Sequence, residues 1–167
     1  MRPLLLRRGW ERMAAAMDLA YEFTYRAQLK PPVNVGPGPF GNRQVFEVIE
    51  GEVEGERLNG RVLAGGGEWF LVGADGFGRI DVRIQLETDD GAFVYAQYFG
   101  LLELNDAVQG FISGQQEETQ FGDQYFRTSP RLECGDPRYA WVNQTVFVAE
   151  GRGCPGYGVE YRVFRVT

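Results

Sequence analysis

Residues 78–102 read GRIDVRIQLETDDGAFVYAQYFGLL, and this stretch decides the fold. Apolar residues occupy every second position of IDVRIQLE, so one face of the segment is apolar and the other is charged or polar. Because successive side chains of a strand point to opposite faces, this alternation predicts a half-buried strand near Gly78–Glu87. Asp90-Gly91 then marks a tight turn, and a second strand is expected near Ala92–Leu102. The stretch predicts an antiparallel hairpin.

The same signals recur on both sides of this hairpin. Alternation begins at Leu19, and short apolar runs are separated by glycine-rich turns. Asn105–Gly122 is the one region inside the body with helical spacing, and we expect a short helix and a loop there. The further strands are expected near Leu58–Leu63, Glu68–Val72, Tyr125–Pro130, Tyr139–Glu150 and Gly158–Val166, with a corner at Glu133–Arg138.

About eight or nine antiparallel strands without βαβ alternation predict an all-β fold in one domain, residues 17–167. A closed up-and-down or lipocalin-like barrel removes exposed strand edges, and a compact sandwich is the alternative. An eight-stranded barrel has room for side chains or for one small ligand.

Composition excludes several classes of function. The net charge is −6, which a phosphate backbone repels, so we expect no nucleic-acid partner. The chain has no His, which removes the commonest general base and metal ligand, and we expect no metal and no cofactor. Gly36, Gly38 and Gly41 form a literal G-x-G-x-x-G, but prolines interrupt it and no helix follows, so a nucleotide site is rejected. Cys134 and Cys154 are too few for a disulfide scaffold.

Residues 1–16 differ from the rest of the chain. They combine arginines with a short apolar run, Leu4–Leu6, that is far too short for a secretory signal. The first interpretation is a leader that precedes a natural start at Met17. The alternative is a short helix packed on the body or on a second subunit, as in a homodimer. No apolar run reaches the length of a membrane span, so we expect a cytoplasmic protein without a membrane partner.

Several motifs together resemble one known family. They are GPGPFGNR (36–43), GEVEG (51–55), LNGRVLAGGGEW (58–69), DVRIQLETDDGA (81–92), residues 125–151 from YFRTSP to VFVAEG, and VEYRVFRV (159–166). In this order they resemble the DUF3237 family, also called UPF0311, from Leu19 to Val166. The resemblance implies a single-domain antiparallel β-barrel, of a kind found in bacteria and fungi and largely without assigned function.

This chain departs from the family pattern at Glu68, where the motif has Asp before Trp69. The longer side chain displaces the carboxyl group by about 1 Å, and displacements of that size cost catalytic efficiency. The departure therefore counts against a catalytic role for Glu68.

The first candidates for chemistry are Asp81 and Arg83, on the polar row of the hairpin. One interpretation is a solvated outer face. The other places Arg83 inside the barrel beside Asp81, where an Arg anchors a substrate carboxylate or enolate. Without His, a general base would be Asp81, Glu68, Glu133 or a Tyr.

The candidates for ligand binding are Trp69, Tyr98, Arg127, Trp141 and Asn143. Read as a strand, residues 139–150 place Trp141 and Asn143 on one amphipathic row, which is typical of a ligand-lining face. The alternative is that Trp141 fills the core, Asn143 satisfies a nearby turn and Arg127 forms a salt bridge to a carboxylate of a loop.

Three functions remain open at this stage. The first is a cofactor-independent enzyme that moves protons, such as an isomerase, cyclase or lyase, on a small hydrophobic or aromatic, and in one version acidic, substrate. The second is a lipocalin-like carrier, which predicts a cavity without a carboxylate of perturbed pKa. The third is an accessory protein, which predicts a filled barrel and an exposed apolar patch.

Overall fold

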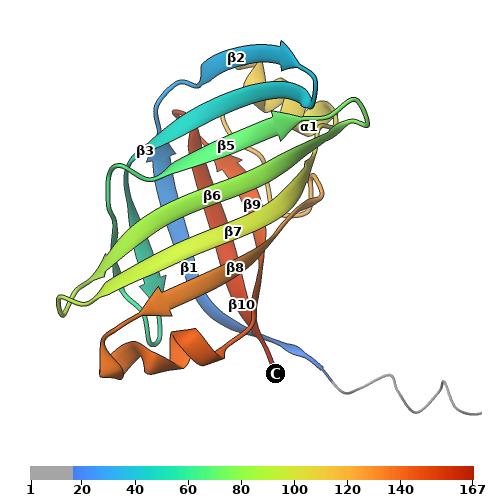
Figure 1. The fold of residues 1–167 in the computed structure, drawn as a ribbon. Coiled ribbons are helices and arrows are strands. Elements are labelled where there is room, and N and C mark those ends of the chain that lie inside the picture. Colours follow the sequence, from blue (N-terminus) through green and yellow to red (C-terminus); the bar gives the residue numbers. More distant parts are fainter. Residues whose placement is uncertain (1–16) are drawn as a thin grey trace, which may run out of the picture.

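The computed structural model describes residues 17–167 as an antiparallel β-barrel (Figure 1). The segment 1–16, for which the sequence predicts a leader or a short helix, lies outside the described residues. The strands are β1 (Leu19–Leu29), β2 (Val33–Gly38), β3 (Gly41–Gly55), β4 (Gly60–Val62), β5 (Gly67–Val72), β6 (Phe77–Thr88), β7 (Phe93–Glu103), β8 (Phe126–Cys134), β9 (Phe147–Cys154) and β10 (Gly158–Val166). The two helical elements are α1 (Asp106–Ile112) and the 3-10 helix η1 (Pro137–Gln144).

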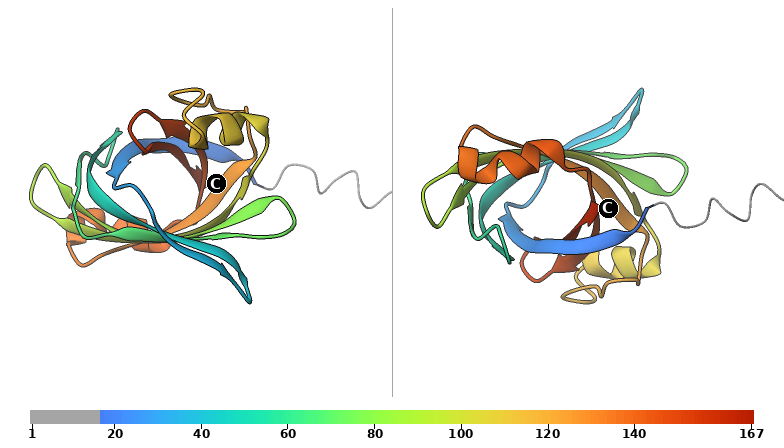
Figure 2. Two further views of the ribbon diagram at one scale, coloured as in Figure 1. Left: turned by 90° about the horizontal axis from the view of Figure 1, so that it is seen from above. Right: turned by 90° about the horizontal axis from the view of Figure 1, so that it is seen from below.

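The barrel wall closes because β1 pairs with β10 on one side and with β3 on the other. Between these strands the wall runs through β9, β8, β7 and β6. β4 and β5 share one place between β6 and β3, since each pairs with a different part of both neighbours. Eight strand positions result, which confirms the predicted all-β antiparallel barrel. β2 pairs only with β3, and the two form an arm that projects from the ring (Figure 2).

The hairpin that decides the fold is present as predicted. β6 and β7 pair over their whole length, from Phe77 opposite Glu103 to Glu87 opposite Phe93. The apolar row of β6 is buried and faces the barrel interior, while the charged row stays on the outer face. Gly91 adopts a positive φ of 85° in the turn, a conformation that favours glycine.

The predicted strand Tyr139–Glu150 is wrong over its first half. Asp136 caps η1 by accepting a hydrogen bond from the Arg138 amide, and Pro137 occupies the first turn, where proline suits a helix. Asn143 hydrogen-bonds the Cys134 amide and carbonyl at 2.8 Å each, so a side chain replaces the backbone pairing of a strand. Regular pairing resumes only with β9, and Trp141 and Asn143 therefore share no strand face.

The two helical elements lie at opposite ends of the barrel (Figure 1). At the η1 end, aromatic rings fill the interior: Phe147 packs against Phe23 and Trp141, with ring centroids 6.2 and 6.3 Å apart. The short helix α1 confirms the helical potential that the sequence shows in this region. Among residues 17–167, no helix is long and apolar enough to cross a membrane.

Candidate functional site

A cavity of about 540 Å³ opens at the α1 end of the barrel. Its walls come from β1, β3, β5, β7 and β8, from the β9–β10 turn, and from α1 with the segment that follows it. The lining residues are Leu29, Pro32, Gln44, Phe46, Glu68, Phe70, Leu102, Val108, Phe111, Ile112, Gly114, Gln116, Glu117, Thr119, Gln124, Phe126, Gly153, Pro155, Gly156, Tyr157, Gly158 and Val159. A volume of this size is within the range of small-molecule sites.

Helix α1 forms one wall of this cavity. Asn105 caps the helix by accepting a hydrogen bond from the Val108 amide, and Val108 is buried. The Phe111 ring packs directly over Gly153 of β9, where a side-chain Cβ would lie 2.7 Å from the ring. This close approach holds α1 beside the β9–β10 turn, and both elements line the cavity.

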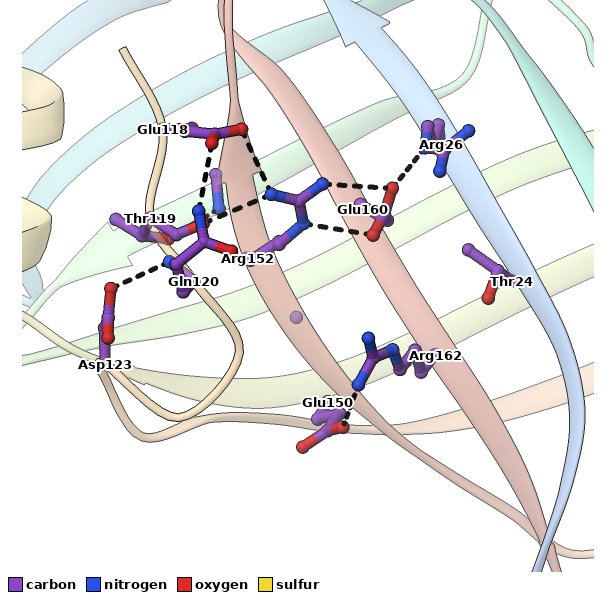
Figure 3. Close-up of polar contacts among 12 residues, drawn as sticks. Thr24, Arg26, Glu118, Thr119, Gln120, Asp123, Glu150, Arg152, Glu160 and Arg162 are labelled. Carbon is purple, nitrogen blue, oxygen red and sulfur yellow. Dashed lines mark hydrogen bonds and ion pairs between the residues drawn. The ribbon is translucent and has the colours of Figure 1, made fainter. Parts of the chain in front are cut away.

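The segment between α1 and β8 is tied to the outer face of β9 and β10 by a charged network (Figure 3). Arg152 donates to Glu118 at 3.1 Å and to Glu160 at 3.0 Å, and Arg26 pairs with the same Glu160. Two hydrogen bonds add to the attachment: the Thr119 amide donates to the Gly153 carbonyl, and the Gly153 amide donates to the side-chain oxygen Oγ1 of Thr119. The network therefore fixes a segment that forms part of the cavity wall.

Glu68 contributes the one acidic side chain of the barrel strands that lines the cavity. It lies on β5 opposite Phe46 of β3 and Val82 of β6, in the inward row that also contains Phe70. The residue is half-buried, and its accessible surface lies in the cavity. Among the described residues its carboxyl group has no hydrogen bond and no ion pair. Desolvation by the surrounding protein, helped by the charge of Asp81, raises its pKa to about 8.

Three tyrosines fill the middle of the barrel behind Glu68. Tyr25 stacks on Tyr161 with centroids 4.9 Å apart, and Tyr98 lies 6.1 and 5.5 Å from these two rings. Tyr161 also meets Phe126 of the cavity wall, at 5.1 Å. Burial raises the pKa of all three phenols, and the nearby Glu68 charge raises them further. The Tyr25 hydroxyl has no hydrogen-bond partner among the described residues. The tyrosines are therefore neutral at physiological pH.

Asp81 and Arg83 lie on the outer face of β6, so the hypothesis that places Arg83 inside the barrel is wrong. The buried side chains of this strand are those at even positions, including Val82 and Ile84. Arg83 donates to Asp81 at 2.8 Å and stacks over Trp69 at 5.3 Å, and Trp69 is itself 41% exposed. Alternation along the strand places all three residues outside the cavity.

Of the other four ligand-binding candidates, one points into the barrel and the others lie elsewhere. Tyr98 points inward, in the tyrosine cluster. Arg127 is on the outer face of β8, 3.6 Å from Glu150. Trp141 packs at the η1 end under the Arg57 guanidinium, 3.8 Å from its ring centroid. Trp141 therefore has the packing role that the sequence left open, and Arg127 forms a salt bridge as the alternative proposed, although its partner lies on β9 and not in a loop.

Asn143 lies beside a second hollow, which is more open to solvent than the cavity and measures about 660 Å³. The Asn143 amide is already engaged at both ends by the Cys134 backbone. Cys134 and Cys154 are both buried and free, so they do not pair. Among residues 17–167, no cluster of His, Cys, Asp and Glu side chains is suited to hold a metal ion.

The residues that sequence reasoning missed come from the α1 region. Gln116, Thr119 and Gln124 reach the cavity from a segment with no regular structure, and no periodic signal marks them. The sequence did contain a signal for Glu68: it lies two residues before Phe70 in GEWF, so both side chains are on the same face of the strand. The structure places Glu68 in the cavity, while the residues first chosen for chemistry lie outside it.

Comparison with known proteins gives a consistent result. The chain matches the DUF3237 family, described as a protein of unknown function, over residues 17–166. It is 31% identical over 140 residues to a UPF0311 protein of Rhodopseudomonas palustris (strain TIE-1), covering 81% of this chain and 88% of that protein. The crystal structure of a conserved protein of unknown function from Rhodopseudomonas palustris has a TM-score of 0.81 at 29% identity, covering 90% and 98% of the two chains.

A more distant fold neighbour is a fungal protein. The structure described as an enzyme from Penicillium herquei has a TM-score of 0.66 at 15% identity, covering 90% of this chain and 95% of that chain. At this identity the comparison shows a shared fold and nothing more.

Proposed function

The chain belongs to the DUF3237 family, and on that premise we propose that it is a cofactor-independent acid–base enzyme in which Glu68 transfers a proton to and from a small hydrophobic or aromatic substrate. The reaction class is isomerisation, cyclisation or elimination. Each of these requires that a proton leave one substrate atom and that a proton be delivered to another. A single carboxyl group in a largely apolar cavity serves both steps. The extra methylene group of Glu68 relative to the Asp of the family motif counted against this role, but its carboxyl group lines the cavity, and the proposal rests on that position.

The observation that carries the proposal is the state of the Glu68 carboxyl group. It has no ion-pair partner among the described residues, and its pKa is raised to about 8 by desolvation. At pH 7.5 roughly one quarter of such groups are ionised, so both the acid and the base form are present. A general acid–base catalyst works best with a pKa near the operating pH.

The surroundings of Glu68 supply the remaining requirements. Phe46, Phe70 and Phe126 offer flat apolar walls for an aromatic or alicyclic ring. The Phe70 ring lies against Gly78 of β6, where a Cβ atom would be only 1.9 Å from it, so the packing holds that wall in place. A rigid wall orients a substrate carbon against the carboxyl group, which is what proton transfer needs.

The competing functions predict other features. A carrier predicts a cavity without a carboxylate of perturbed pKa, and an accessory protein predicts a filled barrel. The cavity of about 540 Å³ argues against the accessory protein, and the raised pKa of Glu68 favours the enzyme over the carrier. The fold neighbour that is described as an enzyme is compatible with this choice.

Proton exchange tests the proposal without knowledge of the natural substrate. A panel of bicyclic ketones that fit the cavity is first screened for binding, and the exchange of their α-protons in D₂O is then followed by NMR. We expect the protein to accelerate exchange for at least one ligand, and Glu68→Gln to reduce the acceleration by roughly 100-fold or more. Arg83→Ala, on the outer face, is the control and should retain it. Cavity ligands whose exchange is never faster than in buffer would contradict the proposal.

A further inference from the structure

The charges on the cavity wall are all of one sign. Glu68 and Glu117 are the only charged side chains among the described lining residues. The neighbouring arginines are engaged elsewhere: Arg83 with Asp81 on the outer face, and Arg152 with Glu118 and Glu160. An anionic ligand would therefore enter the cavity without a cation to compensate its charge, at a large desolvation cost.

The polar groups that accompany the two acids are neutral. Gln44, Gln116 and Gln124 line the cavity with amide side chains, and most of the remaining lining residues are apolar. Gln124 is buried, with 4% of its surface exposed, and its Nε2 donates a hydrogen bond to the Gly151 carbonyl at 3.1 Å. Its Oε1 atom has no partner among the described residues. A lining of this kind suits an uncharged ligand that is mainly apolar and has a few polar atoms.

The acidic side chain that a barrel strand contributes to the cavity is Glu68, and its protonated carboxyl group is free to donate. No described residue accepts a hydrogen bond from it, and its inward position between Phe46 and Val82 directs it toward the cavity. An unpaired polar group in an apolar site is satisfied best by a ligand atom of complementary type. For a carboxylic acid that atom is an acceptor such as a carbonyl oxygen.

From this arrangement we infer that the cavity binds an uncharged ligand whose carbonyl oxygen accepts a hydrogen bond from the Glu68 carboxyl group, and that it rejects carboxylates. The inference rests on the proposed function in one respect, namely that the ligand meets Glu68. It removes acids from the substrates that the sequence left open, because the arginine that was to anchor them lies on the outer face.

Three naphthalenes of matched size test the inference by isothermal titration calorimetry at pH 6.5 with the full chain. 2-Acetylnaphthalene carries the carbonyl acceptor, 2-isopropenylnaphthalene has a methylene group in place of the carbonyl oxygen, and 2-naphthoate carries an anion in place of the acetyl group. We expect the ketone to bind roughly tenfold tighter than the hydrocarbon, which is the effect of satisfying one buried donor. We expect naphthoate to bind at least tenfold more weakly than the ketone.

Two variants assign the preference to Glu68. Glu68→Gln retains an N–H donor and should keep the ketone preference, whereas Glu68→Leu should reduce it to less than twofold. A ketone preference that survives unchanged in Glu68→Leu would overturn the inference. So would naphthoate that binds as tightly as the ketone to the wild-type protein, a measurement that does not depend on whether the Leu variant folds.

The outcome is separable from that of the proposed function. Glu68→Gln keeps the predicted binding but loses proton transfer, so binding selectivity without exchange activity would contradict the enzyme and leave the ligand class standing. Exchange activity that depends on Glu68, together with tight binding of naphthoate, would contradict the ligand class alone. A 2-naphthylmethylammonium probe that binds tighter than the ketone would also overturn the inference, in favour of a cationic ligand.

Discussion

The pH dependence of stability offers the sharpest test of the position of Glu68. Its ordinary pKa is near 4.5, and its pKa in the folded protein is about 8. The unfolded chain therefore loses the Glu68 proton at a lower pH than the folded protein does. Between about pH 4.5 and pH 8 the folded state binds the additional proton, so the free energy of unfolding falls as pH rises through this window and levels off above it.

The magnitude follows from the two pKa values. Their difference of about 3.5 units corresponds to roughly 5 kcal/mol, at 1.36 kcal/mol per unit. Water in the cavity solvates part of the carboxyl group, so this figure is a ceiling and we expect about 2–5 kcal/mol. The groups around Glu68 are Asp81 on β6, Glu117 at the α1 end, and the phenols of Tyr25, Tyr98 and Tyr161, whose raised pKa values keep them neutral here.

The chain is well suited to this measurement because it contains no His. Few other groups titrate between pH 5 and 8 as a result. Glu22 and Glu160 have lowered pKa values, because arginines pair with them, and they act with the opposite sign: they stabilise the fold above their unfolded pKa, and this stability is lost on acidification. Their effect is therefore confined to the acid side of the window.

Urea denaturation of the wild type and of Glu68→Gln, followed by tryptophan fluorescence at pH 5, 6, 7, 8 and 9, gives the required free energies. Because part of the effect is already present at pH 5, the wild type should lose about 2–4 kcal/mol relative to the variant between pH 5 and pH 9. Glu54→Gln, which removes an exposed carboxylate from the outer face of β3, should follow the wild type. A difference between wild type and Glu68→Gln that stays constant within about 0.5 kcal/mol over this range would refute the reasoning.

Three further predictions concern the residues outside the cavity. Arg83→Ala should change ligand affinity in the cavity by less than about twofold, as measured by calorimetry, because its side chain lies on the outer face. Arg152→Met should lower the free energy of unfolding by about 2 kcal/mol, since buried Glu160 keeps only its pairing with Arg26. Amide hydrogen exchange should then become faster between residues 115 and 124. Unchanged exchange in this segment would argue against its attachment through Arg152. Trp141→Ala should cost about 3 kcal/mol in urea denaturation while cavity ligands still bind to the folded variant, and a selective loss of binding would show that Trp141 has a role in the site.

Much of the barrel was predictable because strand alternation is a local signal. The paired strands β6 and β7 follow directly from the alternating pattern around Asp90-Gly91. The interpretation failed where a local signal was ambiguous: the aromatic and β-branched residues between Tyr139 and Val148 are typical of a strand, but Pro137 and the Asp136 cap start a 3-10 helix. A short apolar run does not by itself separate a short helix from a strand.

The candidate site was less predictable, and Arg83 and Glu68 show why. Both residues lie on strands with clear alternation, so the sequence divides each strand into two faces. In β6 the charged row contains Arg83. The apolar row is buried, so the charged row faces outward. In β5 the row with Glu68 also contains Phe70, yet a carboxylate in an apolar row contradicts the usual pattern. Such contradictions are often found at functional sites.

The amino-acid sequence by itself determined most of the strands, the hairpin turn of β6 and β7, the family and the absence of His, because these depend on side-chain period, turn chemistry and composition. Only the tertiary structure decided which polar groups meet. Closure of the ring between β1 and β3 brings Glu68 toward tyrosines that are distant along the chain, and α1 with its following segment covers that end. The raised pKa of Glu68 is a consequence of this enclosure. Desolvation depends on what surrounds a group in space, and neighbours along the chain do not specify it.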